Sequence, residues 1–275
     1  MLLQNKIAII YGAGGSLGGA VAKALSAAGA KLFLTGRNIA PVQKVANEII
    51  ASGGIVQADV VDAMDEQAIK QHLDSIVSQF SSIDISFNAA AQDLVQGLPL
   101  INMTVSDFMQ PIQLMLQTQF LTATAAGRVM AKQGYGVILT LTATPAGITY
   151  PYTAGFGPAC SALECFSKSL ASEIGIYGVR VVNIRSAGSP DSRVFKEAID
   201  GDPALMADVL EKMENDTMLK ELPAMEDIAN VAVFLASSLA SKITGVTVDV
   251  TCGTTSGLNY RAIKEKGDLY TGRPL

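Results

Sequence analysis

The sequence predicts an α/β protein: a single domain built on a doubly wound parallel sheet of the Rossmann type, with helices on both faces. Short β-branched runs alternate with stretches of helical period along the 275 residues. Most of these runs are apolar throughout, which is typical of strands buried on both faces of a parallel sheet. The first run leads directly into a glycine-rich turn, and right-handed crossovers complete the doubly wound order.

The elements follow in order along the chain. Strands are predicted at Ile7–Tyr11, Lys31–Thr35, Ile55–Asp59, Ile83–Asn88, Gly136–Leu141, Val179–Ile184 and Thr247–Val250. Amphipathic helices are predicted at Leu17–Ala28, Ala40–Ser52 and Asp65–Phe80. No repeat or linker divides the chain, so residues 1–258 form one domain, followed by a polar C-terminal tail at 259–275.

Two further helical stretches, Phe108–Met130 and Phe156–Ile176, are apolar on all sides. Helices of this kind are buried, and in an open sheet their outer faces commonly form subunit contacts. We therefore expect a homo-oligomer, either a dimer or a tetramer.

Composition and charge exclude several function classes. Hydrophobic residues make up 49% and the net charge is −5, which argues against disorder and against nucleic-acid binding. Three cysteines and a single histidine, His72, show no metal-ligand spacing. No apolar stretch reaches the length of a membrane span, and no signal-peptide pattern precedes the first strand. We expect a cytoplasmic protein with a small-molecule substrate.

The first strand runs into a glycine-rich segment and then a helix. Glycines permit a tight turn there and let backbone N–H groups approach a pyrophosphate at the positive end of the helix. A glycine-rich turn without a ligand is the simpler alternative, but strand, turn and helix in register favour a dinucleotide site. The expected contacts are Gly12, Gly15, Ser16, Leu17 and Gly18.

The end of the second strand favours NADP(H) over NAD(H). NAD-binding proteins place an acid about 20 residues after the turn to bind the ribose hydroxyl. Here Arg37 and Asn38 follow the strand, and the next acid is Glu48. Arg37 can bind a 2′-phosphate through two N–H groups, although it could also be a solvated surface residue.

Several further segments occur at family-specific spacings. They are Asp59-Val60, Asn88-Ala89-Ala90-Ala91, Lys168–Ala171, Tyr177–Val181 and Ile243–Gly245. With the glycine turn, these segments make the chain resemble the short-chain dehydrogenase/reductase family over about residues 5–255. The resemblance implies that Asp59 and Val60 contact adenine and that Asn88, Ala89, Ala90 and Ser192 line the cofactor site. One departure is Ser16, which stands where the family has its middle glycine.

The resemblance also locates the family's catalytic tetrad. Its Asn, Ser, Tyr and Lys correspond to Met115, Ala143, Phe156 and Cys160. In the family, the Tyr donates a proton, the Lys lowers the pKa of that Tyr, and the Ser orients the carbonyl. Ketone reduction by that mechanism is therefore not expected.

Two hydroxyl groups near these positions are candidate replacements. Tyr152 lies eight residues before Cys160, near the spacing of the family's enoyl reductases, and Thr142 precedes the Ser position. A packed loop aromatic and a backbone-bonded threonine are the alternatives. Cys160 and Cys165 are interpreted as small buried hydrophobes, because no nearby cation marks a thiolate.

The segment 192–223 corresponds to the family's substrate-covering region. Its methionines, Met206, Met213 and Met218, suit an irregular apolar substrate, or alternatively fill gaps in the core.

Three functions are open at this point. The first is an NADP(H)-dependent oxidoreductase, an enoyl or enone reductase with non-standard acid catalysis. The second is a catalytically inactive NADP(H)-binding homologue that acts as a partner subunit or scaffold. A non-redox lyase or isomerase in the same pocket is the third.

Overall fold

The computed structural model describes residues 1–90 and 96–256, so the predicted tail and Ala91 lie outside the described residues. Within them, seven strands form one parallel sheet in the order β3-β2-β1-β4-β5-β6-β7. The strands are β1 (Ile7–Tyr11), β2 (Lys31–Gly36), β3 (Val56–Val60), β4 (Ile85–Asn88), β5 (Gly136–Ala143), β6 (Val179–Ser186) and β7 (Thr247–Val250). The predicted fold class is confirmed.

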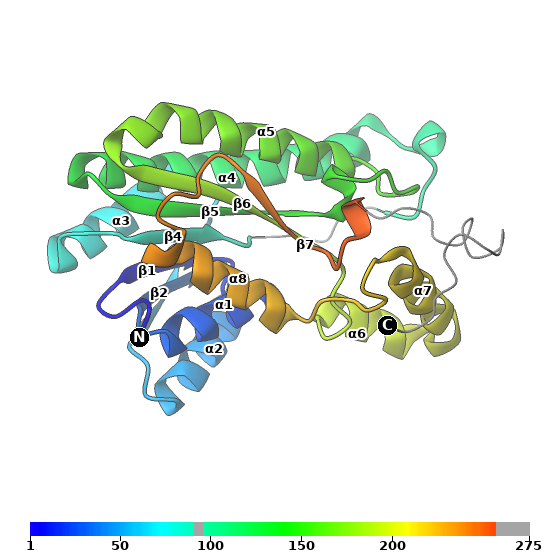
Figure 1. Ribbon diagram of the computed structural model, residues 1–275, viewed down its shortest axis with the longest axis horizontal. Coiled ribbons are helices and arrows are strands. Elements are labelled where there is room, and N and C mark those ends of the chain that lie inside the picture. The colour runs from blue at the N-terminus through cyan, green and yellow to red at the C-terminus, as the bar shows by residue number, and fades with distance from the viewer. Residues whose placement is uncertain (91–95, 257–275) are drawn as a thin grey trace, which may run out of the picture.

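Helices cover both faces of this sheet (Figure 1). One face carries α1 (Ser16–Ala27), α2 (Ile39–Ala51) and α8 (Met225–Ala236), and the other carries α3 (Glu66–Phe80), α4 (Val105–Gln133) and α5 (Phe156–Ile174). Two further helices, α6 (Arg193–Gly201) and α7 (Pro203–Asp216), lie beyond the carboxyl ends of the strands. Each face has its own hydrophobic core.

The strand order reverses between β1 and β4, because the chain winds outward through β2 and β3 before it crosses to β4. Ligands of open α/β sheets bind in the crevice at such a switch point, at the carboxyl ends of the strands. The glycine-rich turn and the end of β4 both lie there.

Some predicted boundaries were wrong. The third strand begins at Val56 and the fourth at Ile85, and Ile55 is exposed. The fifth and sixth strands each continue two residues further than predicted, because Thr142 and Ala143 pair in register with Arg185 and Ser186. The edge strand β3 is only partly buried, so the inference that strands are buried on both faces fails there.

The two apolar helices are not buried on all sides. Val105, Met109 and Phe120 on α4 are exposed, as is Ile176 just after α5. The small side chains of these helices made them look uniformly apolar, whereas the sheet covers only one side of each. Helix α4 is also longer than predicted, since Thr104 caps it by accepting a hydrogen bond from the Asp107 N–H and Gly134 ends it in a left-handed conformation.

Candidate cofactor and substrate site

The glycine-rich turn brings three segments into close contact. Gly12 has φ +73°, and a Cβ on it would lie 2.6 Å from the Ala90 nitrogen. A Cβ on Gly18 would lie 2.4 Å from the Gly12 carbonyl oxygen. Only glycine fits at either position, so the end of β1, the start of α1 and the turn after β4 meet as a phosphate-binding turn requires.

The amino end of α1 is open to an anion. The helix begins at Ser16, its N-cap Gly15 offers no side-chain hydrogen bond, and its first turn holds no acid. The first N–H groups of a helix lack intrahelical partners and carry partial positive charge. Leu17 and Gly18 lie in this first turn, so the predicted contacts form one cradle that fits a pyrophosphate.

Four of the predicted cofactor residues lie at the carboxyl ends of the neighbouring strands, two just after β2 and two in the last residues of β3. Arg37 and Asn38 are exposed directly after β2, and Asn38 caps α2 without a side-chain hydrogen bond. Asp59 and Val60 end β3, in register with Thr35 and Gly36. The structure therefore places these four residues along the same edge as the glycine turn.

Asn88 organises the turn that faces Gly12. Its side-chain oxygen accepts a hydrogen bond from the Ala90 N–H at 2.7 Å, and its amide donates to Thr122 Oγ1 at 3.0 Å. The Ala89 N–H donates to the Tyr11 carbonyl. Asn88 thus positions the turn after β4, and both polar atoms of its side chain already have hydrogen-bond partners.

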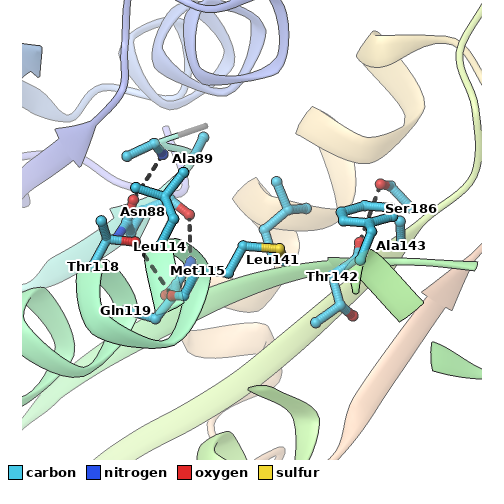
Figure 2. Close-up of a pocket in the computed structure, with 12 residues that line it drawn as sticks. Asn88, Ala89, Leu114, Met115, Thr118, Gln119, Leu141, Thr142, Ala143 and Ser186 are labelled. Carbon is cyan, nitrogen blue, oxygen red and sulfur yellow. Dashed lines mark hydrogen bonds between the residues drawn. The ribbon is translucent and has the colours of Figure 1, made fainter. Parts of the chain in front are cut away.

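A pocket of about 180 Å³ opens beside this turn, between α4, β5 and the start of α5 (Figure 2). No side chain among the described residues that line it titrates near neutral pH. They are Asn88, Ala89, Ala90, Leu114, Met115, Thr118, Gln119, Leu141, Thr142, Ala143, Phe156 and Ser186.

The polar side chains of the pocket already have partners. Gln119 donates to the Asn88 carbonyl at 2.9 Å, Thr118 donates to the Met115 carbonyl at 3.3 Å, and Ser186 donates to the Thr142 carbonyl at 3.2 Å. The last two bonds are long for hydroxyl donors. Thr118 and Ser186 are therefore the hydroxyls in the pocket wall that a ligand oxygen could recruit.

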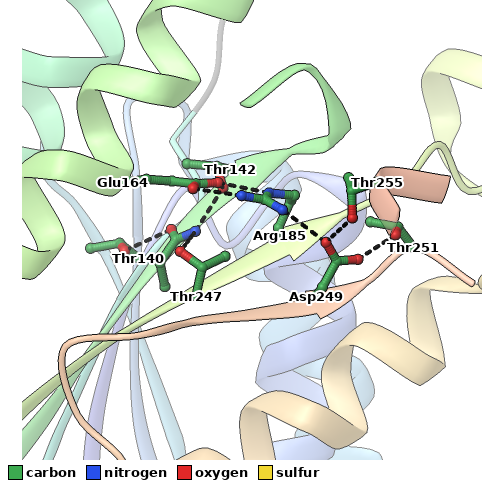
Figure 3. Close-up of polar contacts among 9 residues, drawn as sticks. Thr140, Thr142, Glu164, Arg185, Thr247, Asp249, Thr251 and Thr255 are labelled. Atoms are coloured by element: carbon green, nitrogen blue, oxygen red, sulfur yellow. Dashed lines mark hydrogen bonds and ion pairs between the residues drawn. The ribbon is translucent and has the colours of Figure 1, made fainter. Parts of the chain in front are cut away.

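Thr142 lines the pocket, but its hydroxyl is used elsewhere (Figure 3). It accepts a hydrogen bond from the Asn183 amide at 2.7 Å and donates one to Glu164 at 3.0 Å. It therefore belongs to a polar network on the α5 side of the sheet.

That network centres on Arg185. Its guanidinium forms two hydrogen bonds with Glu164, at 2.8 and 2.7 Å, and one with Asp249, at 2.9 Å. Asp249 also accepts hydrogen bonds from Thr251 and Thr255. The side chains of Arg185 and Glu164 are 15% and 10% exposed. Buried charges need this degree of pairing, so the network ties α5 to β6 and β7 directly behind the pocket.

Tyr152 lies outside the pocket lining. Its side chain is 55% exposed and its φ is +64°. The structure therefore does not bring Tyr152 to the pocket that Ala143 and Phe156 line.

Cys160 follows Phe156 by one helical turn and is completely buried. Burial raises the pKa of its thiol to about 11, although a hydrogen bond from the Ala143 backbone opposes the shift. The thiol is thus neutral near pH 7, in line with the interpretation of Cys160 as a small hydrophobe. Cys165 is exposed, so the same interpretation was wrong for that residue.

The segment 192–223, which is predicted to cover the substrate, contacts the glycine-rich turn at the start of α6. Ser192 caps α6, and the next residue, Arg193, donates its N–H to Ser16 Oγ at 2.9 Å. Phe195 and Met213 lie over Gly188, where a Cβ would be 2.5 Å from the Phe195 ring and 2.7 Å from Met213 Cε. Met218 packs in the same way on Gly253.

Sequence reasoning missed Ser186 and Gln119 as pocket residues. Ser186 lies just before the Ala187-Gly188 step after the sixth strand, and this position could have identified it. Gln119 lies one turn after Met115 on α4, and nothing distinguished it from the other polar residues of that helix.

Across residues 1–90 and 96–256, no helix is both long and apolar enough to cross a membrane. In the same ranges, no cluster of His, Cys, Asp and Glu could hold a metal ion.

Known proteins share this architecture. The family model described as enoyl-(acyl carrier protein) reductase matches residues 12–255. The chain is 28% identical to the 7alpha-hydroxysteroid dehydrogenase of Escherichia coli over 257 residues, covering 94% of this chain and 97% of that protein. It is also 28% identical to the 3-oxoacyl-(acyl-carrier-protein) reductase of Escherichia coli over 258 residues, covering 92% and 98%.

A solved structure of levodione reductase, 23% identical, superposes with a TM-score of 0.86 over 93% of this chain and all of that one. At this identity the superposition supports the fold, and the family match supports the ancestry. The chain belongs to the short-chain dehydrogenase/reductase family of oxidoreductases.

Proposed function

We propose that the chain is an NADP(H)-dependent oxidoreductase that reduces the carbon–carbon double bond of an enoyl or enone group. The observation that carries the proposal is a pocket whose described lining residues include no titratable side chain, placed beside a glycine-rich turn that fits a pyrophosphate. By family spacing, Met115, Ala143 and Phe156 stand for the Asn, Ser and Tyr of the tetrad, and all three line this pocket.

This chemistry suits a pocket whose described lining residues include no proton donor that titrates near neutral pH. When bound, the nicotinamide supplies a hydride. For a conjugated double bond, the pocket then has to stabilise only an enolate oxygen, since water can protonate the carbon. For a ketone, the developing alkoxide needs a proton donor, and Phe156 has none to give.

Three hydroxyls are candidates to stabilise the enolate, and Thr118 in the pocket wall is one of them. Ser186 offers a hydroxyl in the pocket wall, at the end of a long hydrogen bond that it can exchange. Tyr152, predicted from sequence, requires closure of its loop. The hydroxyl of Thr142 is held by Asn183 and Glu164, which favours a positioning role for this residue.

The preference for NADP(H) rests on the end of β2. Arg37 directly follows the strand, and the loop to α2 carries no acid. A carboxylate there would repel a 2′-phosphate, whereas a guanidinium attracts it. We also propose a cytoplasmic homo-oligomer that covers the exposed apolar residues of α4, where Phe120 packs on Phe166.

The test is NADPH consumption with a panel of apolar enones and the matching saturated ketones. Enones should be reduced and ketones should not. Ser186→Ala and Tyr152→Phe test two of the three hydroxyls separately. The variant that removes the hydroxyl bound to the enolate should lower kcat by about a hundredfold. Tyr177→Phe, at an exposed position after α5, serves as the control. Faster reduction of ketones than of enones would overturn the proposal.

A gain-of-function variant tests the assignment of the tetrad positions. Ala143→Ser, Phe156→Tyr and Cys160→Lys together should create ketone reduction, because Ala143 and Phe156 already line the pocket and Cys160 lies one helical turn after Phe156. Absence of ketone turnover in a folded triple variant that still binds NADPH would contradict the assignment.

The second candidate is an inactive NADP(H)-binding partner subunit or scaffold. It is favoured by the same lack of an acid and by the covering of Gly188 by Phe195 and Met213. NADPH binding without turnover of any enone or ketone, together with co-purification of an active homologue, would support it over the reductase.

A further inference from the structure

His72, the only histidine of the chain, is held against the end of β3. It lies on α3 with its side chain 10% exposed, and its Nε2 is 3.1 Å from Asp59 Oδ2. An ionised carboxylate can only accept hydrogen bonds, so the proton of this bond resides on Nε2. The imidazole is therefore the donor that orients Asp59.

The surroundings of the imidazole offer it few hydrogen-bond partners other than Asp59. The Phe33 ring packs against the imidazole in a T-shaped arrangement, with ring centroids 6.3 Å apart and an interplanar angle of 72°. The other ring nitrogen, Nδ1, is buried without a partner. Losing the bond to Asp59 would leave both ring nitrogens unsatisfied inside the protein, which makes the pairing strongly preferred.

Asp59 keeps free capacity to accept hydrogen bonds. A carboxylate has about four lone-pair sites. His72 uses one on Oδ2, and Gln57 uses one on Oδ1 through a 3.1 Å bond. The Asp59 side chain is 29% exposed, so its remaining sites face solvent.

His72 and Asp59 lie along the edge of the sheet where the dinucleotide is proposed to bind. The glycine-rich turn follows β1, Arg37 follows β2, and Asp59 lies in the last two residues of β3, so the three lie in order along one edge of the sheet. A nucleotide with its pyrophosphate on the turn and its ribose near Arg37 must place its base beyond the ribose. Val60, 62% exposed, offers an apolar surface for that base beside Asp59.

We propose that His72 is a positioning residue for base selectivity. It fixes the Asp59 carboxylate so that an open lone pair meets the exocyclic amino group of adenine. Hypoxanthine carries an oxygen at that position and would be repelled by the same carboxylate. This inference rests on the proposed function, because it assumes that a nicotinamide dinucleotide binds.

The experiment compares NADPH with its hypoxanthine analogue by isothermal titration calorimetry. Wild type should bind NADPH more tightly than the analogue. His72→Leu should weaken NADPH binding about five- to tenfold, the effect of misplacing one hydrogen bond, and leave the analogue nearly unchanged. His72→Gln, which can donate from a similar position, should restore most of the selectivity.

Two additions keep the test decisive. Asp59→Asn provides a second variant if His72→Leu does not fold, and it should also lose selectivity. In untagged protein the single histidine gives one set of imidazole NMR signals, which should shift more with NADPH than with the analogue. Equal weakening of both ligands in His72→Leu, or no change, would overturn the role of His72. Failure of wild type to bind either ligand would instead overturn the proposed function.

Discussion

The backbone N–H of Arg193 donates a hydrogen bond to the side-chain oxygen of Ser16, across 177 residues of sequence. Ser16 lies in the first turn of α1, and Arg193 is the first residue of α6. Ser16, which is predicted to stand where the family has its middle glycine, thus joins the amino end of α1 to the start of α6.

Ser16→Ala should loosen α6 and leave the sheet unchanged. The Arg193 N–H would lose its acceptor, and a typical hydrogen bond contributes about 1 kcal/mol. Amide exchange at the start of α6 should rise roughly fivefold, which hydrogen–deuterium exchange mass spectrometry would detect. Ser78→Ala on α3, where the hydroxyl bonds only to its own helix, is the control. Unchanged exchange in α6 would show that the contact does not hold the covering region.

Arg37→Ala should change the cofactor preference. If the guanidinium binds a 2′-phosphate, its loss removes charge-assisted hydrogen bonds worth about 1.5–3 kcal/mol. The Kd for NADPH should then rise roughly tenfold or more, while the Kd for NADH stays constant. Lys70→Ala, at an exposed cation paired with Asp74 on α3, should change neither constant. Equal effects on NADPH and NADH would assign Arg37 a structural role.

Arg185→Met should destabilise the fold strongly. It would leave the carboxylates of Glu164 and Asp249 without their shared cation, and breaking a buried ion pair in this way costs about 3–5 kcal/mol. Urea unfolding followed by circular dichroism would measure the loss. The double variant Arg185→Met with Glu164→Leu should recover much of it, because no carboxylate then remains buried against α5. A double variant no more stable than the single one would contradict this account.

Because of Cys160, the free energy of unfolding should depend on pH in the alkaline range. Burial raises the pKa of its thiol from 9.0 to about 11, so the folded protein keeps a proton that the unfolded chain releases. The contribution of this thiol to the free energy of unfolding is fully present below pH 9.0. It is lost progressively as the pH rises from 9.0 towards 11.

The urea midpoint should fall across that window in wild type and fall less in Cys160→Ala. Thiol labelling gives an independent check. Exposed Cys165 should react in the native state, whereas Cys160 should react only on unfolding. Fast native labelling of Cys160 would contradict its burial.

The order of elements and the position of the glycine-rich turn were determined by the sequence alone. Apolar runs, helical periods and glycines act locally: Gly12 and Gly18 are required by contacts within one strand–turn–helix unit. The correspondence of Met115, Ala143 and Phe156 to the family's tetrad stays a prediction from spacing, but the structure does bring all three residues to one pocket.

The contacts between distant segments were decided only by the tertiary structure. The pairs Ser16–Arg193 and Asp59–His72, and the network of Arg185, join elements far apart in sequence. No local pattern encodes such pairs, because a hydrogen bond between two elements depends on how both pack against the sheet. For the same reason, the sequence could not show that Thr142 would bond to Asn183 and Glu164 while Ser186 presented its hydroxyl to the pocket.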